Sequence, residues 1–413
     1  MTTWVLQRAR RGVLLGVVAS VPVFCLPLVT QDPYGIPKVT MVLAGVGVAG
    51  LLRCLDLRPL SVAAGRLLVP AACVSAPLLL GWLGSSYQTL GVMGVYGRYA
   101  GLLPYLALII LAVLVADAFA GRSRALELAA VVGAGVVGWF TVIQAAGLDP
   151  SVGRQILDYP YSTIGNSNFL GGFLALSLPL GLSVWARSDR TRFVGLLGTI
   201  GIALGIILAF SQGGWAASIA AIGVFTGARA AHRSRRWLFL GAAAALVITS
   251  LSVGAVLWSL RAPNGPLSSE TVRVRGLFWM AAVEMGVESP IVGHGPAAFS
   301  VEGPHHRPAE DALIQGAVAA DDPHNVLLSM FVSGGVLAVG GFLLVMLWVW
   351  RTALSLPLEG PAAGFVASVA AYVVQAAVSV DQFILSFGLW IAVAGLAAAA
   401  GDRPVDPAGR GEG

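Results

Sequence analysis

The residues best suited to chemistry lie in one polar stretch, Arg261 to Gly335. It is the longest polar interruption of an otherwise apolar sequence, and it holds four of the five histidines. It includes Asp321-Asp322-Pro323-His324-Asn325, directly before a hydrophobic run. A neutral imidazole placed there can accept a proton from a hydroxyl group. Spacing alone favours a plainer interpretation, in which Asp322 or Asn325 caps the following helix and His324 is a bystander at the membrane interface.

Basic residues expected on the extracytoplasmic side form a second group of candidates, because the preference of Lys and Arg for the cytoplasmic side does not explain them. Arginine presents a planar, permanently charged group that binds phosphate through paired hydrogen bonds, so these side chains suit a diphosphate. The four that we consider are Arg98, Arg154, Arg273 and Arg275. The alternative is that individual arginines reach lipid headgroups or pair with nearby acids.

The segment from Val274 to Glu288 has apolar residues at helical spacing and is followed by Ser289-Pro290. This pattern predicts an amphipathic helix on the outer membrane face. Arg275 would lie near the positive N-terminal end of that helix, where an anion is favoured. Gly293-His294-Gly295-Pro296 then predicts a turn.

Several histidines in one loop raise the question of a metal. The adjacent His305 and His306 rarely both ligate one ion, and the sequence contains no HExxH or CxxC motif. Cys25, Cys54 and Cys73 lie in or beside apolar runs without metal-ligand spacing. We therefore expect no metal site, no disulfide and no cofactor.

Composition indicates which elements must position these residues. Hydrophobic residues make up 57% of the 413 and charged residues 11%, whereas about a quarter of a soluble domain is charged. The apolar runs have the length of membrane helices and lack the short alternating pattern of barrel strands. The sequence therefore predicts an all-α polytopic membrane protein. Its net charge of +5 comes from short clusters between apolar runs, which indicates topology and not a nucleic-acid partner.

Hydropathy predicts about twelve membrane-spanning helices. Their ranges are 13–30, 38–52, 67–83, 101–119, 125–146, 169–186, 193–210, 215–229, 237–260, 325–350, 361–378 and 383–400. They divide the chain into spans one to nine (1–260), a large extracytoplasmic loop with short helices and the candidate site (261–324), spans ten to twelve (325–400) and a tail (401–413). The connection at Ser211-Gln212-Gly213-Gly214 is very short for two separate spans.

The distribution of basic residues predicts the orientation. With the N-terminus placed inside, 18 of the 25 Lys and Arg residues fall inside, and the remaining seven are Lys38, Arg98, Arg154, Arg261, Arg273, Arg275 and Arg307. Orientation follows the Lys and Arg content of short loops. Both termini are therefore expected in the cytoplasm and the large loop outside.

Four blocks of residues, in order along the chain, carry a family resemblance. They are Gly97-Arg98-Tyr99-Ala100-Gly101-Leu102, Ser162-Thr163-Ile164-Gly165-Asn166-Ser167-Asn168-Phe169-Leu170-Gly171, Arg275-Gly276-Leu277-Phe278-Trp279 continued by Pro290 to Phe299, and Asp322-Pro323-His324-Asn325 followed by Gly334-Gly335. Together they resemble the O-antigen ligase and O-antigen polymerase superfamily of bacterial membrane glycosyltransferases. Two positions depart from the family pattern. Gln212 stands where many relatives have Arg, and Asp322 is acidic where a basic residue is common.

The resemblance implies a helical fold of the GT-C type in the bacterial inner membrane and a metal-independent, inverting transfer on its periplasmic face. The donor would be a glycan on undecaprenyl diphosphate, and the acceptor a hydroxyl of lipid A core or a similar molecule. His324 would be the base or orienter for the acceptor, while Arg275 and Arg98 would stabilise the diphosphate leaving group. Further candidates for substrate binding are Arg273, Arg154, Lys38, Asn166, Asn168 and Asn325.

Other functions stay open at this point. The superfamily also includes surface-polysaccharide polymerases and protein O-oligosaccharyltransferases, and the sequence does not name the acceptor or the oligomeric state. A secondary transporter with twelve helices, a peptidoglycan glycosyltransferase of the shape and division class, and a purely structural membrane protein are further alternatives. Transporters tend to place charged sites near the midplane and to show repeat symmetry, whereas the candidates here gather in one outer loop.

Overall fold

The computed structural model describes residues 2–26, 31–149, 159–262, 265, 269–315 and 320–401, which form helices and turns and no strands. The first part of the chain contains α1 (Thr2–Ser20), α2 (Gly35–Cys54), α3 (Val62–Gly84), α4 (Gln88–Met93), α5 (Leu102–Ala118), α6 (Ser123–Ala145), η1 (Ser162–Ile164), α7 (Ser167–Trp185), α8 (Thr191–Leu208), α9 (Gln212–Ala230) and α10 (Arg236–Arg261). The second contains α11 (Glu270–Glu288), α12 (Phe299–Glu302), η2 (Gly303–His306), α13 (Ala309–Gln315), α14 (Val326–Ser355), α15 (Pro361–Ala376) and α16 (Phe383–Ala400).

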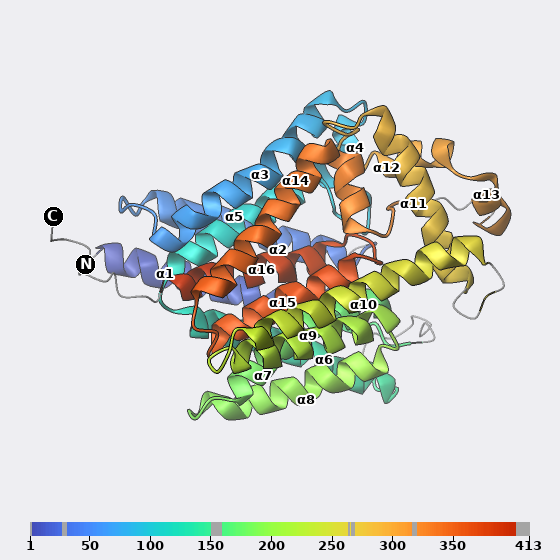
Figure 1. Ribbon diagram of the computed structural model, residues 1–413. Helices are drawn as coiled ribbons and strands as arrows, with labels where there is room; N and C mark the ends of the chain where they lie inside the picture. The colour runs from blue at the N-terminus through green and yellow to red at the C-terminus, as the bar shows by residue number, and fades with distance from the viewer. Residues whose placement is uncertain are drawn as a thin grey trace, which may run out of the picture.

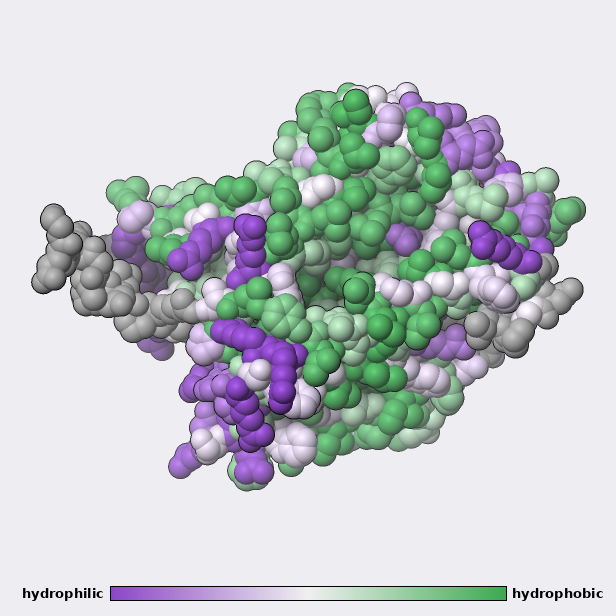
Figure 2. All heavy atoms as spheres, viewed as in Figure 1, coloured by the Kyte–Doolittle hydropathy of each residue, from purple (hydrophilic) through white to green (hydrophobic). Residues whose placement is uncertain are grey.

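Eight of the described helices are long and apolar enough to cross a membrane: α2, α3, α6, α7, α8, α10, α14 and α16. The apolar helices α5 and α15 are shorter, and α1 and α9, with 19 residues each, are less apolar. Each of the predicted ranges overlaps one of these helices, although α1 ends at Ser20 and not at Thr30. Hydrophobic side chains cover the middle of the visible face, with hydrophilic ones gathered toward its two ends (Figure 2). The chain is a multi-pass membrane protein.

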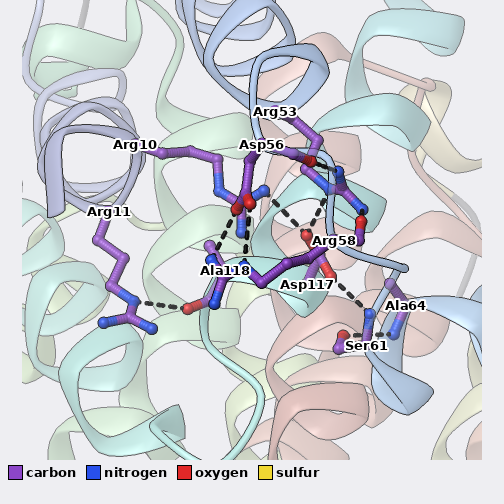
Figure 3. A network of polar contacts seen from close by, with 9 residues as sticks. All are labelled: Arg10, Arg11, Arg53, Asp56, Arg58, Ser61, Ala64, Asp117 and Ala118. Carbon is purple, nitrogen blue, oxygen red and sulfur yellow. Dashed lines mark hydrogen bonds and ion pairs between the residues drawn. The ribbon is translucent and has the colours of Figure 1, made fainter. Parts of the chain in front are cut away.

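At one end of the bundle, which we call the Asp117 end, a buried aspartate joins four helices (Figure 3). Asp117 of α5 forms ion pairs of 2.9 Å with Arg10 of α1 and with Arg53 of α2. Its Oδ1 also accepts a hydrogen bond of 2.7 Å from the backbone N–H of Ser61, just before α3. Arg11 of α1 donates to the carbonyl of Ala118 at 2.8 Å. The network therefore joins the middle of α1 to the last turns of α2 and α5 and to the beginning of α3.

We expect Asp117→Ala to lower the free energy of unfolding by about 3 kcal/mol, because removing one partner of a buried ion pair leaves the other charge uncompensated. Arg10, only 4% exposed, would be that charge. Reversible denaturation in mixed micelles measures the change. Glu359→Ala is the matched control, since Glu359 is exposed. Equal stability of the two variants would contradict a structural role for the network.

At the opposite end, the His324 end, α14 is interrupted by two glycines. Gly334 and Gly335 leave the helical conformation, and Gly335 has φ 65°. The opened backbone pairs with the turn that follows α11: the N–H of Val336 donates to Pro290 at 2.8 Å, and that of His294 donates to Val332 at 2.7 Å. A Cβ at position 335 would lie 2.1 Å from the carbonyl oxygen of Ile291, so the contact requires glycine. The turn predicted at 293–296 is displaced: the backbone turns at 290–292 and at 296–298, and the N–H groups of His294 and Gly295 between them donate to α14.

Helices α11, α12 and α13 gather at the His324 end, while α1 runs toward the other end (Figure 1). α11 ends at Glu288, as the sequence predicts, but begins at Glu270. An amphipathic helix on the membrane surface would turn its apolar side toward the membrane, and this expectation for α11 was wrong. Leu277, Ala282 and Met285 are buried against protein, because α10 and α14 pack on this side of α11. The exposed apolar side chains of α11 include Met280 and Val287.

Candidate functional site

A cavity of about 740 Å³ lies at the His324 end of the bundle. Its walls come from the first residues of α7, α9 and α11, from the end of α15 and from residues 320–324. The structure thereby brings together five of the predicted site residues, which are far apart in the sequence: Arg98, Asn166, Asn168, Arg275 and His324.

Three other predicted site residues do not line this cavity. The Lys38 ammonium donates hydrogen bonds to the carbonyls of Phe24 and Tyr34 at 3.0 Å each and of Thr163 at 2.6 Å. Lys38 is only 2% exposed. Its hydrogen bonds join η1 to the beginning of α2. Its predicted role in substrate binding therefore gives way to a structural one.

Arg273 and Asn325 are also engaged elsewhere. Arg273 forms an ion pair with Glu310 of α13. Asn325 caps α14, as expected, by accepting hydrogen bonds from the backbone of Leu327 and Leu328 at 3.0 and 3.2 Å, while its amide donates to Ala377 at 2.9 Å. Both side chains stabilise the segments that carry the cavity. Arg154 lies outside the described residues.

His324 is held in a fixed orientation by its neighbour Asp322. The Asp322 carboxylate accepts a hydrogen bond from the His324 N–H at 2.7 Å and another from the Ser329 hydroxyl at 2.9 Å. His324 has φ 61°, a left-handed conformation that these contacts stabilise. Its Nδ1 lies 3.0 Å from the Asp322 carbonyl oxygen. Since a carbonyl only accepts, Nδ1 carries the proton and Nε2 keeps its lone pair.

The surroundings keep the His324 ring neutral. Burial above all, and then the positive charges of Arg275 and Arg98, lower the pKa of His324 to about 4. The ring packs against Phe278 at a centroid distance of 5.3 Å. Burial also raises the pKa of the Asp322 carboxyl to about 7. At neutral pH the cavity therefore contains an imidazole with a free Nε2, which can accept a proton.

The two arginines of the cavity differ in their partners. Arg98 forms a bidentate pair with Asp321, with distances of 2.7 and 3.2 Å, so its charge is largely compensated. Arg275 forms no ion pair with any carboxylate of the described residues, and burial lowers its pKa. Arg275 therefore supplies an uncompensated positive charge beside His324, which suits an anionic group on a ligand.

Three helices point their N-terminal ends at the same cavity. Asn166 caps α7, Ser211 caps α9 and Ser269 caps α11, and all three residues line the cavity. The side-chain oxygen of Asn166 accepts the backbone N–H of Asn168 at 2.9 Å. Because helix N-termini carry partial positive charge, their convergence adds to the anion preference that Arg275 creates.

Sequence reasoning missed two polar residues near the site. Gln375, 2% exposed, reaches the cavity from α15, and the single carboxamide in the apolar range 361–378 was an available signal. Asp381 lines a chamber of about 30 Å³ behind the Arg98–Asp321 pair, and its burial raises the pKa of its carboxyl to about 6. Asp381 is an isolated acid between the last two apolar runs, and its position in the sequence did not link it to the other candidate residues.

Comparison with known protein families gives this geometry a context. The model of a family described as O-antigen ligase matches residues 196–343, from α8 into α14. Over this segment the chain is similar to the O-antigen ligase family. The match confirms the resemblance and supports, in general terms, an O-antigen ligase or polymerase type of function with a lipid-linked glycan donor and an acceptor. No curated protein matches the chain.

The matched O-antigen ligase segment contains Arg275 and His324 but not the two earlier sequence blocks. The fold joins these blocks to it, because Arg98 and Asn166 line the same cavity as His324. The candidate site is therefore built from the O-antigen ligase segment together with the first residues of α7 and the segment before α5.

Proposed function

We propose that this protein is a metal-independent, inverting glycosyltransferase of the GT-C type. It moves a glycan from undecaprenyl diphosphate to an acceptor hydroxyl at the outer face of the bacterial inner membrane. In this proposal all twelve helices that overlap the predicted ranges cross the membrane, both termini are cytoplasmic, and the His324 end faces the periplasm. The observation that carries the proposal is a neutral His324 with a free Nε2 beside the uncompensated Arg275 in one cavity.

The chemistry follows from this arrangement. Nε2 of His324 accepts the proton of the acceptor hydroxyl, and the oxygen attacks the anomeric carbon on the side opposite the diphosphate. The bond between that carbon and the diphosphate oxygen breaks, and its electron pair leaves with the diphosphate. The attack from the opposite side inverts the configuration. Arg275 and the N-terminal ends of α7, α9 and α11 stabilise the negative charge of the leaving group.

The departure at Gln212 is compatible with this charge balance. Gln212 is the first residue of α9 and lines the cavity without a charge. The backbone at the beginning of α9 still presents positive partial charge there. We therefore assign most of the diphosphate binding to Arg275 and the helix ends, and a smaller part to Arg98, which Asp321 already compensates.

The position of the cavity favours transfer over transport. Secondary transporters bind their substrates near the membrane midplane, between structural repeats. Here the cavity lies among helix ends at one end of the bundle. The acceptor class is a matter for experiment, with lipid A core, a growing glycan and a protein as the three candidates.

The direct test is a transfer assay with purified protein in vesicles, an undecaprenyl-diphosphate-linked glycan, each candidate acceptor and EDTA. Mass spectrometry identifies the products. A glycan joined to lipid or protein establishes a ligase, and a lengthened glycan on the carrier establishes a polymerase. Folded protein that transfers glycan to no acceptor would argue against the proposal, and activity lost with EDTA would argue against metal independence.

Asp322 provides a sharper test of the geometry. We expect Asp322→Ala to lower kcat by about tenfold or more, because His324 loses the contact that fixes its backbone and its ring. Asp322→Asn should retain most of the activity, since its side-chain oxygen still accepts the His324 N–H. Steady-state kinetics of both variants measure the difference. Equal losses in the two would mean that the negative charge, and not the hydrogen bond, matters at position 322.

A further inference from the structure

Phe210 occupies a position in which a large side chain is unusual. It follows the last turn of α8 with φ 50°, the left-handed conformation in which glycine is the usual residue at a helix end. Its side chain is nevertheless 54% exposed and lines the cavity next to Ser211 and Gln212. A strained backbone that presents an exposed ring to a cavity suggests that the ring has a function beyond connecting α8 to α9.

Two further aromatic side chains form a row with Phe210. The ring of Tyr159 lies 5.1 Å from that of Phe210, and the ring of Trp215 lies 6.2 Å from it. Tyr159 is 46% exposed and Trp215 40%. The Trp215 indole N–H donates to the carbonyl of Ile206 at 3.0 Å, which anchors its ring to α8. We call Tyr159, Phe210 and Trp215 the aromatic row.

Uncharged polar residues reach the cavity from the helices next to Phe210. Gln212 and Gly213 follow Phe210, and Asn168 and Gln375 belong to the packed group of α7, α9 and α15. Gln375 donates to the carbonyl of Asn168 at 3.4 Å. α11, which carries Arg275, packs against α10 and α14 instead. Three carboxamides, those of Asn168, Gln212 and Gln375, therefore come from the α7, α9 and α15 side of the cavity, whereas Arg275 comes from α11.

We propose that the aromatic row and the adjacent carboxamides form a subsite for one sugar ring of a glycan substrate. The C–H bonds on one face of a pyranose carry partial positive charge and pack on the negative face of an aromatic ring. The sugar hydroxyls pair with carboxamide groups such as that of Gln212, which donate and accept hydrogen bonds. This subsite rests on the proposed glycosyl transfer and adds to it where the sugar binds, away from the diphosphate at Arg275.

The backbone conformation of Phe210 allows its ring to be removed without destabilising the fold. Because glycine adopts φ 50° without strain, Phe210→Gly removes the ring and relieves the backbone, so the variant should fold at least as well as the wild type. Phe210→Tyr keeps a ring in place. Phe193→Ala is the matched control, since Phe193 is an exposed phenylalanine at the other end of α8.

The experiment measures KM separately for the undecaprenyl-diphosphate-linked donor and for the acceptor, with full-length protein in vesicles. We expect Phe210→Gly to raise one of these KM values about tenfold with kcat within about twofold, and Phe210→Tyr to restore it. The substrate whose KM changes is the one whose sugar occupies the subsite. Unchanged KM values for both substrates would overturn the proposal.

A binding measurement separates the subsite from the transfer activity. Saturation-transfer NMR is recorded with the glycan released from its carrier, and in parallel with undecaprenyl phosphate that carries no glycan. We expect a signal for the released glycan in wild type and Phe193→Ala that is lost in Phe210→Gly. Binding without transfer would keep the subsite and remove the proposed function. No glycan signal in wild type, or a loss confined to undecaprenyl phosphate, would overturn the subsite.

Discussion

Replacing His324 with alanine is expected to reduce glycan transfer by about 10³-fold while leaving the protein folded in the membrane. General base catalysis contributes effects of this size, and no other imidazole lines the described cavity to replace it. The assay is transfer of the undecaprenyl-diphosphate-linked glycan, followed by mass spectrometry. His305→Ala, in the same polar stretch but outside the cavity, is the control and should retain activity.

The pH profile distinguishes a base from a residue that only orients the acceptor. Since the pKa of His324 is lowered to about 4, the imidazole is unprotonated above that value. Activity should therefore stay level across neutral pH and decline only as the pH falls toward 4. The profile is best recorded in Asp322→Asn, because the Asp322 carboxyl titrates near 7. A decline centred near the ordinary imidazole value of about 6.5 would contradict the environment described for His324.

Replacing Arg275 with lysine is expected to lower kcat/KM by about 100-fold even though the charge is retained. The guanidinium can donate two parallel hydrogen bonds to phosphate oxygens, and the ammonium of lysine provides a single point charge on a flexible chain. Arg275 has no competing carboxylate among the described residues, so its donors are available to the diphosphate. Steady-state kinetics against donor concentration measure the loss.

Arg261→Lys is the matched control for Arg275→Lys. Arg261 ends α10 in the same polar stretch, is exposed and does not line the cavity. It should therefore tolerate the change. Near-normal turnover of Arg275→Lys would show that only the charge matters there. Arg98→Lys should have a smaller effect than Arg275→Lys, because Asp321 already accepts hydrogen bonds from Nε and Nη2 of the Arg98 guanidinium.

Much of the fold follows from properties of single segments. Hydropathy depends only on neighbouring residues, and each predicted range overlaps a helix of the structure. The stop at Ser289-Pro290 is likewise local and was predicted correctly, and Asn325 is one of the two caps that the sequence offered for α14. The side of α11 that faces the membrane was not predicted correctly. An apolar stripe is buried equally well by lipid and by other helices, and in this protein α10 and α14 cover it.

The sequence by itself determined the class of the protein, the positions of its helices and a group of residues able to bind diphosphate and move a proton. Only the tertiary structure decided which of them share one cavity. Arg98 and His324 both line that cavity. Lys38 instead donates hydrogen bonds to three backbone carbonyls, and Arg273 forms an ion pair with Glu310. The tautomer of His324 and the exposure of Phe210 also depend on the fold. The physical reason is that hydropathy and capping act over a few residues, while burial, charge compensation and hydrogen-bond partners depend on segments that are distant in the chain.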